Sequence, residues 1–489
     1  MNGEGATPGP PTDPAAILRS RGYAGLLVVA AILGVPISAA AYGFLALVDK
    51  LQSWLYTSLP QGLGFGGTPW WWPLPLLTLA GLLVGLIIRH LPGTGGHSPA
   101  DGFKAGGVAP PAELPGIALA ALATLSLGAV LGPEAPLIAL GGGLAAWAVG
   151  LGGRPRPPRA TAVVGAAGSF AAISTLFGSP LLGAFLLMEA SGLGGPALGV
   201  VLVPGLVAAG VGSLVFVGLD SWTGLGAFSL ALPDLPQVGP PTLAGFAWAL
   251  VIGLVAAMVG TAIRRLALAL RPQVERRLLL ATPLVGLAVG LLAVLYAQVS
   301  GHAISDVLFS GQNQLGPLVG QSATYSVGAL TLLVAAKGLA YGASLAAFRG
   351  GPVFPAMFLG AAGGIALSHL PGLSMVPGIA MGIGAMSVVL LRLPMTSVLL
   401  ATLLLASDGL AVMPLVIVAV AVAYVASARL SSPSEDAGPP GRPEHHHEGP
   451  IRPEGDQHGH RTRAAAGPGV QPSRVPRGDH RGAGAPPGE

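Results

Sequence analysis

One acidic residue, Glu134, lies within a long stretch of sequence that is otherwise uncharged. It belongs to the segment Gly132–Pro136, and no charged residue occurs in Leu114–Pro133 before it or in Ala135–Gly153 after it. A carboxylate at membrane depth is costly, and it commonly marks the pathway of an ion or a proton. The glycine and prolines around the acid predict a helix that starts inside the bilayer. Because helix starts bind anions, a protonatable acid at this place could compete with an anion.

Two other segments combine glycine and proline in a similar way. One runs from Pro92 to Pro99 and is expected to enter a short helix near Ala100. The other covers 350–355 and is expected to enter a helix over Ala356–Leu367. Glycine leaves the backbone N–H groups unobstructed, and a helix N-terminus carries partial positive charge. If the three starts converge, we expect them to bind an anion without a buried lysine or arginine.

The composition is that of a polytopic membrane protein, in which these segments must be held by membrane helices. The chain of 489 residues is 52% hydrophobic and 9% charged, whereas soluble proteins average about 25% charged residues. Uncharged runs such as Thr161–Met188 and Leu235–Ile263 exceed the roughly 20 residues that a spanning helix needs. The 76 glycines and 46 prolines indicate broken helices, which membranes tolerate where the freed backbone is buried or lines a cavity. We predict an all-α fold with many tilted and broken helices.

The chain divides into three parts by composition. Residues 1–21 form a polar N-terminal segment, residues 22–430 a membrane transport domain, and residues 431–489 a tail rich in proline, glycine and histidine. The tail holds almost no large apolar residue, so we predict that it is disordered. Metal binding by its histidines is a weaker alternative, and we predict no metal and no cofactor. The basic loops Arg154–Arg159 and Arg264–Arg277 are expected to be cytoplasmic, as are both termini. The small positive net charge reports this topology and predicts no nucleic-acid partner.

The membrane domain contains an internal repeat, with halves at about 22–220 and 240–430. Pro136 and Pro355 lie in similar Gly-Pro segments, and Pro180 and Pro394 lie at similar positions of a second pair. The separation along the chain is nearly the same for both pairs of prolines, as a repeat requires. Segments interrupted by glycine and proline at corresponding positions of two halves point to a binding site at the repeat interface.

Three motifs, taken in order, resemble those of the CLC family of chloride channels and chloride/proton antiporters. The family's motifs GSGIP, G(K/R)EGP and GxFxP are matched here by Gly93–Pro99, Gly132–Pro136 and Gly351–Pro355. The stretch Gly165–Glu189 is similar to the family's next two helices. The resemblance covers nearly the whole membrane domain. It implies an antiparallel inverted-repeat fold, a homodimer with one ion pathway in each subunit, and Glu134 as the gating glutamate.

The resemblance also implies an anion site built from all three motifs. Its anion-binding residues would be Thr94, Gly95, Ser98, Gly132, Pro133, Ala135, Val353 and Phe354. Thr94 takes the place of the family's serine, and Ser98 competes for this role because one extra residue precedes Pro99. Pro133 replaces a basic residue, which removes positive charge that would attract anions. Ala135 replaces a glycine.

The proton side of the resemblance is less complete. A carboxylate at Glu134 could occupy the anion site as a tethered anion, and protonation would weaken its hold there. Antiporters of the family often carry a second, inner glutamate just after the position of Glu189, where this chain has Ala190. Glu189 is therefore either a candidate proton relay or a structural acid at a helix end. The family's pore tyrosine has no counterpart after Tyr424, a feature shared with the fluoride-exporting branch.

We therefore predict an integral membrane protein of a bacterial-type plasma membrane that transports chloride or a similar halide, gated by a protonatable glutamate. Proton-linked exchange is favoured over an uncoupled chloride channel, and fluoride/proton antiport is a further alternative. From another class, the alternative is an unrelated inverted-repeat secondary transporter for a cation or an organic solute. We do not predict an enzyme, because residues 22–430 show no convincing nucleophile, base or metal-ligand set. Lys337, Arg349 and Arg392 flank apolar runs, and we expect them to reach the membrane interface or to cap helix ends.

Overall fold

The computed structural model of the chain describes residues 17–103, 107–151, 158–192, 196–223, 238–405 and 409–431. The polar segment expected over residues 1–21 is thus described from residue 17, and the first long helix begins at Arg21. The tail beyond residue 431, with its histidines, lies outside the described residues.

Within these residues the chain folds into α-helices joined by short turns, with a single isolated β-bridge and no strand. The α-helices are α2 (Arg21–Ser53), α3 (Leu59–Gly62), α4 (Pro73–His90), α5 (Leu114–Ser126), α6 (Glu134–Gly150), α7 (Pro158–Phe177), α8 (Pro180–Ser191), α9 (Pro196–Thr223), α10 (Leu243–Arg276), α11 (Leu278–Ser300), α12 (Gln312–Gly320), α13 (Val327–Ala347), α14 (Val353–Ser368), α15 (Met375–Leu391), α16 (Pro394–Leu404) and α17 (Gly409–Leu430). The short turns are the π-helix η1 (Trp54–Ser58) and the 3-10 turns η2 (Pro92–Gly95), η3 (Pro99–Asp101), η4 (Pro111–Glu113), η5 (Ile304–Asp306) and η6 (Ser322–Thr324).

The helices have the lengths and surfaces of a membrane protein. Among the residues that the structure describes, eight helices are long and apolar enough to cross a bilayer. On the outward face of α11, Leu284, Leu291 and Leu295 are all exposed. Leucines along one exposed helix face are stable in lipid and unfavourable in water. The protein is therefore an integral membrane protein.

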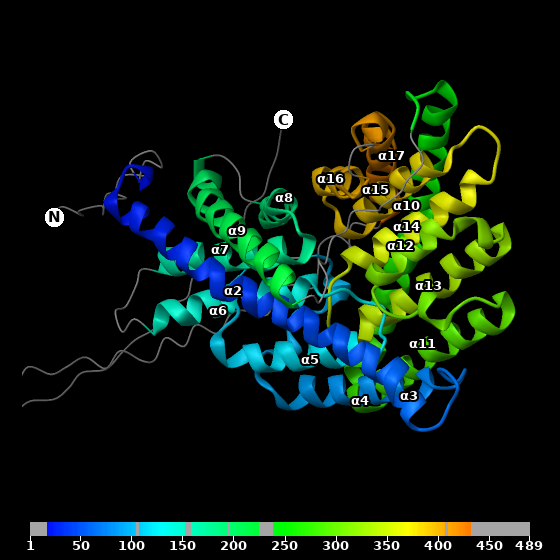
Figure 1. Cartoon of the computed structure of the whole chain (residues 1–489), viewed down its shortest axis with the longest axis horizontal. Helices are drawn as coiled ribbons and strands as arrows, with labels where there is room; N and C mark the ends of the chain where they lie inside the picture. The colour runs from blue at the N-terminus through cyan, green and yellow to red at the C-terminus, as the bar shows by residue number, and fades with distance from the viewer. Residues whose placement is uncertain are drawn as a thin grey trace, which may run out of the picture. The chain divides into compact units, whose positions relative to one another are not determined.

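The packing of the first half is repeated in the second. In the first half α6 packs on α7, and α9 packs on both α7 and α2; in the second, α14 packs on α15, and α17 packs on both α15 and α10. The helices α2, α6, α7 and α9 thus correspond to α10, α14, α15 and α17. Figure 1 shows the two sets side by side, the first coloured from blue to green and the second from green to orange. The predicted all-α inverted-repeat fold is confirmed.

Glycines bring the repeated helix pairs into backbone contact. A Cβ added at Gly141 of α6 would lie 2.6 Å from the carbonyl oxygen of Gly168 in α7, and a Cβ at Gly360 of α14 would overlap the carbonyl of Gly382 in α15. Because lipid gives no hydrophobic drive between helices, such close packing of small residues is what associates them. These contacts fix the axes of α6 and α14, whose first turns form the candidate site.

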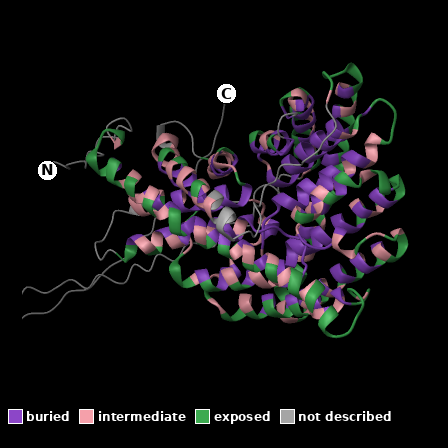
Figure 2. Ribbon diagram, viewed as in Figure 1, coloured by how far each residue is buried: buried purple, intermediate pink, exposed green. Residues whose placement is uncertain are grey.

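The second half holds the densest part of the interior. Every residue of α15 from Val376 to Leu391 is buried, because α10, α14, α16 and α17 all pack against this helix. Figure 2 shows this concentration of buried residues around α13, α14 and α15. Helix α14, which follows the third Gly-Pro segment and packs against α15, therefore has rigid, closely packed surroundings.

Candidate ion-binding site

The second and third Gly-Pro segments meet at the isolated β-bridge. The N–H of Gly132 donates to the carbonyl of Gly351 at 2.7 Å, and the N–H of Gly351 donates back to the carbonyl of Gly132 at 2.5 Å. The pairing is antiparallel, as the inversion between the two halves requires. Immediately after the bridge, α6 begins at Glu134 and α14 begins at Val353. The bridge thus joins two helix starts that are distant in the sequence, one from each half.

The Glu134 carboxylate lies at the start of both helices. Its side chain is fully buried. Its Oε1 accepts a hydrogen bond of 2.9 Å from the N–H of Phe354, and the amides of Val353 and of Glu134 itself also face the carboxylate. Phe354 is the second residue of α14, so its amide is among those that a helix leaves unpaired. The carboxylate therefore fills the place where these helix starts would hold a free anion.

The bridge glycines are needed for the carboxylate to fit. A Cβ added at Gly132 or at Gly351 would overlap the carboxylate oxygens of Glu134. The carboxylate therefore packs directly on the backbone of both segments. Its Oε2 is buried and has no hydrogen-bond partner among the described residues. The site thus contains one acceptor position that the backbone amides do not fill.

A small polar cavity lies on one side of the site. It has a volume of about 40 Å³ and is lined by Pro133, which directly precedes Glu134. Its polar lining includes Asp49 and Gln52 of α2 and Asn313 of α12, and the Asn313 amide donates to Asp49 at 3.2 Å. A cavity of this size and polarity has room for a few water molecules. Water could therefore come close to the Glu134 segment from this side.

Helix α13 fastens both sides of the bridge. The Tyr341 hydroxyl donates to the carbonyl of Pro352 at 2.8 Å, and the Ser344 hydroxyl accepts from the N–H of Val130 at 3.2 Å. Both side chains are fully buried. Sequence reasoning missed these two residues, although two hydroxyl side chains three residues apart near the end of an apolar helix, just before a Gly-Pro segment, were a usable signal.

Lys337 lies one turn before Tyr341 on α13, and its expected role is wrong. The residue does not reach the interface, because its side chain is fully buried. Its ammonium donates to the four successive carbonyls of residues 306–309 at 2.9 to 3.3 Å and lies 4.4 Å from the centroid of the Phe358 ring. These carbonyls replace the water that a buried ammonium loses. Lys337 therefore ties the loop before α12 to the helices that carry the site.

In the described part of the chain, no hydrogen bond joins the side chains of Thr94 and Ser98, in the first Gly-Pro segment, to Glu134. Thr94 is exposed, and Ser98 precedes η3 without a side-chain capping bond. The backbone turns through left-handed conformations at Gly93 (φ 75°) and Thr94 (φ 51°), and the Thr94 carbonyl accepts from the Arg349 guanidinium at 3.2 Å. The expected short helix near residue 100 is one 3-10 turn. This motif therefore joins the third one through Arg349.

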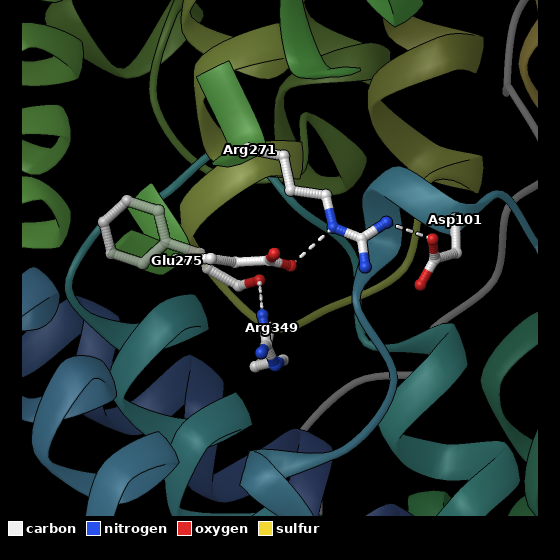
Figure 3. A network of polar contacts seen from close by, with 5 residues as sticks. Asp101, Arg271, Glu275 and Arg349 are labelled. Atoms are coloured by element: carbon white, nitrogen blue, oxygen red, sulfur yellow. Dashed lines mark hydrogen bonds and ion pairs between the residues drawn. The ribbon is translucent and has the colours of Figure 1, made fainter. Parts of the chain in front are cut away.

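A charged cluster holds the end of the first motif. Arg271, near the C-terminus of α10, forms ion pairs with Asp101 and with Glu275, the latter at 2.7 Å. Figure 3 shows Arg349 close to this cluster, with its guanidinium bound to the carbonyl of the neighbouring Phe348 at 3.2 Å. Arg271 belongs to the basic segment that we expect to be cytoplasmic, so this cluster is expected at the inner end of the domain.

Glu189 acts as a helix cap in the structure. Its carboxylate accepts from the N–H groups of Met395 and Thr396 at 3.0 and 2.7 Å and from the Thr396 hydroxyl at 2.7 Å. These donors belong to the first turn of α16, where an acid satisfies unpaired amides. Tyr424 is 38% exposed on α17, as expected of a residue that is not at the site. The two predicted carboxylates are thus engaged at different helix starts.

Of the predicted site residues, Gly132, Glu134, Val353 and Phe354 come together at the bridge. Pro133 and Ala135 lie in the same turn on either side of Glu134. In the first motif Gly95 is buried, with the position of its missing Cβ close to the Arg349 side chain, whereas no hydrogen bond among the described residues links Thr94 or Ser98 to the carboxylate. The structure therefore joins two of the three predicted motifs directly.

Comparisons with known proteins agree with this arrangement. Residues 81–428 match the family described as voltage gated chloride channel. The ion-transport protein YfeO of Escherichia coli (strain SMS-3-5) is 30% identical over 361 residues, which cover 72% of this chain and 81% of that protein. The protein of the same name from Escherichia fergusonii gives the same values.

Two solved structures are similar in fold. A slow cyanobacterial Cl⁻/H⁺ antiporter has a TM-score of 0.66 and 18% identity, covering 84% of this chain and 96% of its own. A CLC-type fluoride/proton antiporter has a TM-score of 0.63 and 22% identity, covering 83% of this chain and 96% of its own. With the family match extending over most of the membrane domain, this chain belongs to the voltage-gated chloride channel family.

Proposed function

We propose that the protein transports chloride or a similar small halide across the plasma membrane of a bacterial-type cell, with Glu134 as a protonatable gate. One observation carries the proposal: a fully buried carboxylate occupies the start of α14, where it accepts the amide of Phe354. A carboxylate held there by backbone donors is a tethered substitute for a free anion. A halide and the ionised Glu134 therefore compete for the same place.

The competition gives a physical mechanism for gating. When Glu134 takes up a proton, it loses its charge and with it the charge-assisted hydrogen bond to Phe354. The neutral side chain then leaves the site more easily, and a halide takes its place between the two helix starts. When the proton is released, the carboxylate competes for the site again. The backbone amides hold the ion without a lysine or arginine in direct contact, so the ion can also leave.

The halide site that we propose consists mainly of backbone groups. Gly132, Pro133 and Ala135 frame it from the α6 side, and Val353 and Phe354 provide amides from the α14 side. Thr94, Gly95 and Ser98 belong to a separate part of the pathway, at the inner end, because Thr94 is exposed beside the charged cluster around Arg271.

We favour proton-linked exchange because Glu134 alone couples the proton to the ion site. A second candidate, uncoupled halide conduction, is supported by Glu189, whose carboxylate is engaged by three donors at α16 and sits next to Ala190. A relay carboxylate must be available to pass a proton on, whereas this carboxylate is engaged in capping α16. The two candidates make opposite predictions about proton movement.

We also propose a homodimer in the bilayer, with both termini of each chain cytoplasmic. The helices α8 and α16 pack together and present exposed apolar side chains, among them Leu181 and Met395. A second copy on this face would bury them. Counting photobleaching steps of singly labelled protein in dilute bilayers tests the dimer, and a single step at all lipid dilutions would contradict it.

The deciding experiment is flux from proteoliposomes under opposed halide and proton gradients, with chloride and fluoride tested separately. We expect halide-driven proton movement in the wild type and its loss in Glu134→Ala, with halide flux retained. Halide flux without proton movement in the wild type would establish conduction in place of exchange. Protein that is shown to be folded and that moves neither ion would overturn the proposal and favour a cation or organic solute.

A further inference from the structure

A buried tyrosine lies next to the proposed ion site. Tyr341 on α13 is fully buried, and its hydroxyl donates to the carbonyl of Pro352 at 2.8 Å. Pro352 directly precedes the first residue of α14, whose second residue, Phe354, binds Glu134. Tyr341 and Glu134 thus bind backbone groups two residues apart, the carbonyl of Pro352 and the amide of Phe354. No hydrogen bond joins these two side chains, both of which lie in the described part of the chain.

The bond between Tyr341 and Pro352 can be given up at low cost. The Pro352 carbonyl also accepts the amide of Ala356, at 3.4 Å, as the first carbonyl of α14. A carbonyl has two acceptor lone pairs, and this one keeps a partner if the hydroxyl turns away. A phenolic hydrogen rotates about the C–O bond without movement of the buried ring. The hydroxyl can therefore redirect its hydrogen while the tyrosine ring stays in place.

The ion site has an acceptor position to which such a hydrogen could be directed. Glu134 Oε2 is buried without a hydrogen-bond partner among the described residues. One oxygen of the buried carboxylate is therefore left without a donor, and an unpaired polar atom is costly in this environment. A halide bound in place of the carboxylate would carry its whole charge on one atom. A donor beyond the backbone amides would therefore stabilise it.

We propose that the Tyr341 hydroxyl is a side-chain donor of the halide site, which it enters when the Glu134 carboxylate leaves. In the closed arrangement the hydrogen points to Pro352, and with a halide bound it points to the ion. A neutral phenol strengthens binding without the firm hold of a fixed cation. This inference rests on the proposed function, and it gives the site a hydroxyl that the exposed Tyr424 does not provide.

The test measures equilibrium binding of chloride and of fluoride to the full-length protein in detergent by titration calorimetry. All variants are made in a Glu134→Ala background, so that no carboxylate competes with the ion. Since a hydrogen bond to a charged group contributes about 1.5–3 kcal/mol, we expect Tyr341→Phe to raise the Kd by on the order of tenfold or more. The proton-competing role of Glu134 is absent in this background and cannot cause the change.

The matched control is Tyr56→Phe. Tyr56 also donates its hydroxyl to a backbone carbonyl at 2.8 Å, that of Leu127, so both variants lose the same kind of bond. We expect Tyr56→Phe to leave the Kd unchanged. A Tyr341→Phe protein with the affinity of the Tyr56→Phe control would overturn the inference and leave halide transport intact. Failure of the folded Glu134→Ala protein to bind either ion would instead count against the proposed function.

A second variant covers the case in which Tyr341→Phe does not fold. A fluorinated tyrosine placed at position 341 keeps the shape of the ring and makes the hydroxyl a stronger donor. We expect the same protein to bind the halide more tightly when position 341 carries this residue. An unchanged Kd would contradict the role of the hydroxyl.

Discussion

The starts of α6 and α14 have matching backbones and different chemistry. Glu134 and Val353 begin the two helices, and their separation along the chain equals that of Pro136 and Pro355. Each segment gives one glycine to the bridge. The first then begins its helix with a carboxylate, whereas the second begins with a fully buried valine and turns the Phe354 amide toward that carboxylate.

In the proposed function, this difference separates a movable part, the Glu134 side chain, from a fixed part, the backbone amides of α14. Two acids at equivalent positions would bring like charges into one buried site, where one of them would stay protonated. Two valines would leave a binding site that does not respond to protons. Under the proposed function, one acid facing one set of amides is the arrangement in which a proton would decide whether the site is filled by the protein or by a free ion.

The largest effect on proton transport is expected when α6 and α14 are made to begin with the same residue. Replacing Glu134 with valine gives both helices the same first residue and removes the group that titrates. We expect proton movement to fall below detection in proteoliposomes while halide efflux persists, because the backbone amides remain. Size-exclusion chromatography should show intact protein. Proton movement that survives in Glu134→Val would mean that another group carries the proton.

A nearly equal effect, on the pH dependence of halide efflux, is expected from Gly351→Ala, which does not replace Glu134 itself. The added methyl group would occupy the space of the carboxylate oxygens, so the acid should be driven out of the site. We expect the halide efflux to lose most of its dependence on pH. The control is Gly363→Ala on α14, the helix that follows Gly351, where a Cβ meets no atom within 4 Å. Unchanged pH dependence in Gly351→Ala would show that the carboxylate does not need this space.

A smaller effect, on the stability of the protein, is expected at the glycine contacts between helices in each half. Gly141→Ala and Gly360→Ala each place a methyl group against the backbone of the partner helix. We expect each to destabilise the protein by about 1–3 kcal/mol through overpacking, with a lower Tm in a thermal stability assay. The larger loss should occur in Gly360→Ala, because the interior around α15 is packed on all sides. A larger loss in Gly141→Ala would contradict this view of the second half.

The smallest effect is expected at the caps of α8 and α16. Ser179 caps α8 by accepting the amide of Leu182 at 3.3 Å, whereas α16 begins after Leu393, which has no side-chain acceptor, and Glu189 takes over the role. We expect Ser179→Ala and Glu189→Ala each to cost about 1 kcal/mol of stability. The ratio of protons to halides should not change in Glu189→Ala. A lower proton share in this variant alone would make Glu189 a relay.

Many features of the fold could be predicted from the sequence because they depend on local residue patterns. The uncharged runs predict membrane helices, and the residues around Glu134 predict the helix start that α6 shows. The spacing of the prolines predicts the repeat, and hence a binding site at the interface of its two halves.

The rest depends on contacts between segments far apart in the sequence. Lys337 is an ordinary basic residue at the edge of an apolar run until the carbonyls of residues 306–309 are placed around it. The exposure of Thr94 follows from a left-handed backbone whose carbonyl is held by Arg349. No periodicity in the first half could reveal a partner located in the second.

The bridge between Gly132 and Gly351 has a consequence for how the chain assembles. Neither half contains all of the proposed ion site, so this site would form only when the two halves dock. A ligand that binds the docked state alone stabilises it by an amount that grows with ligand concentration. Halide ions should therefore slow the separation of the halves and protect the bridge amides from hydrogen exchange. The transported ion would then also act as a chaperone-like ligand, favouring correct association of the halves of its own transporter.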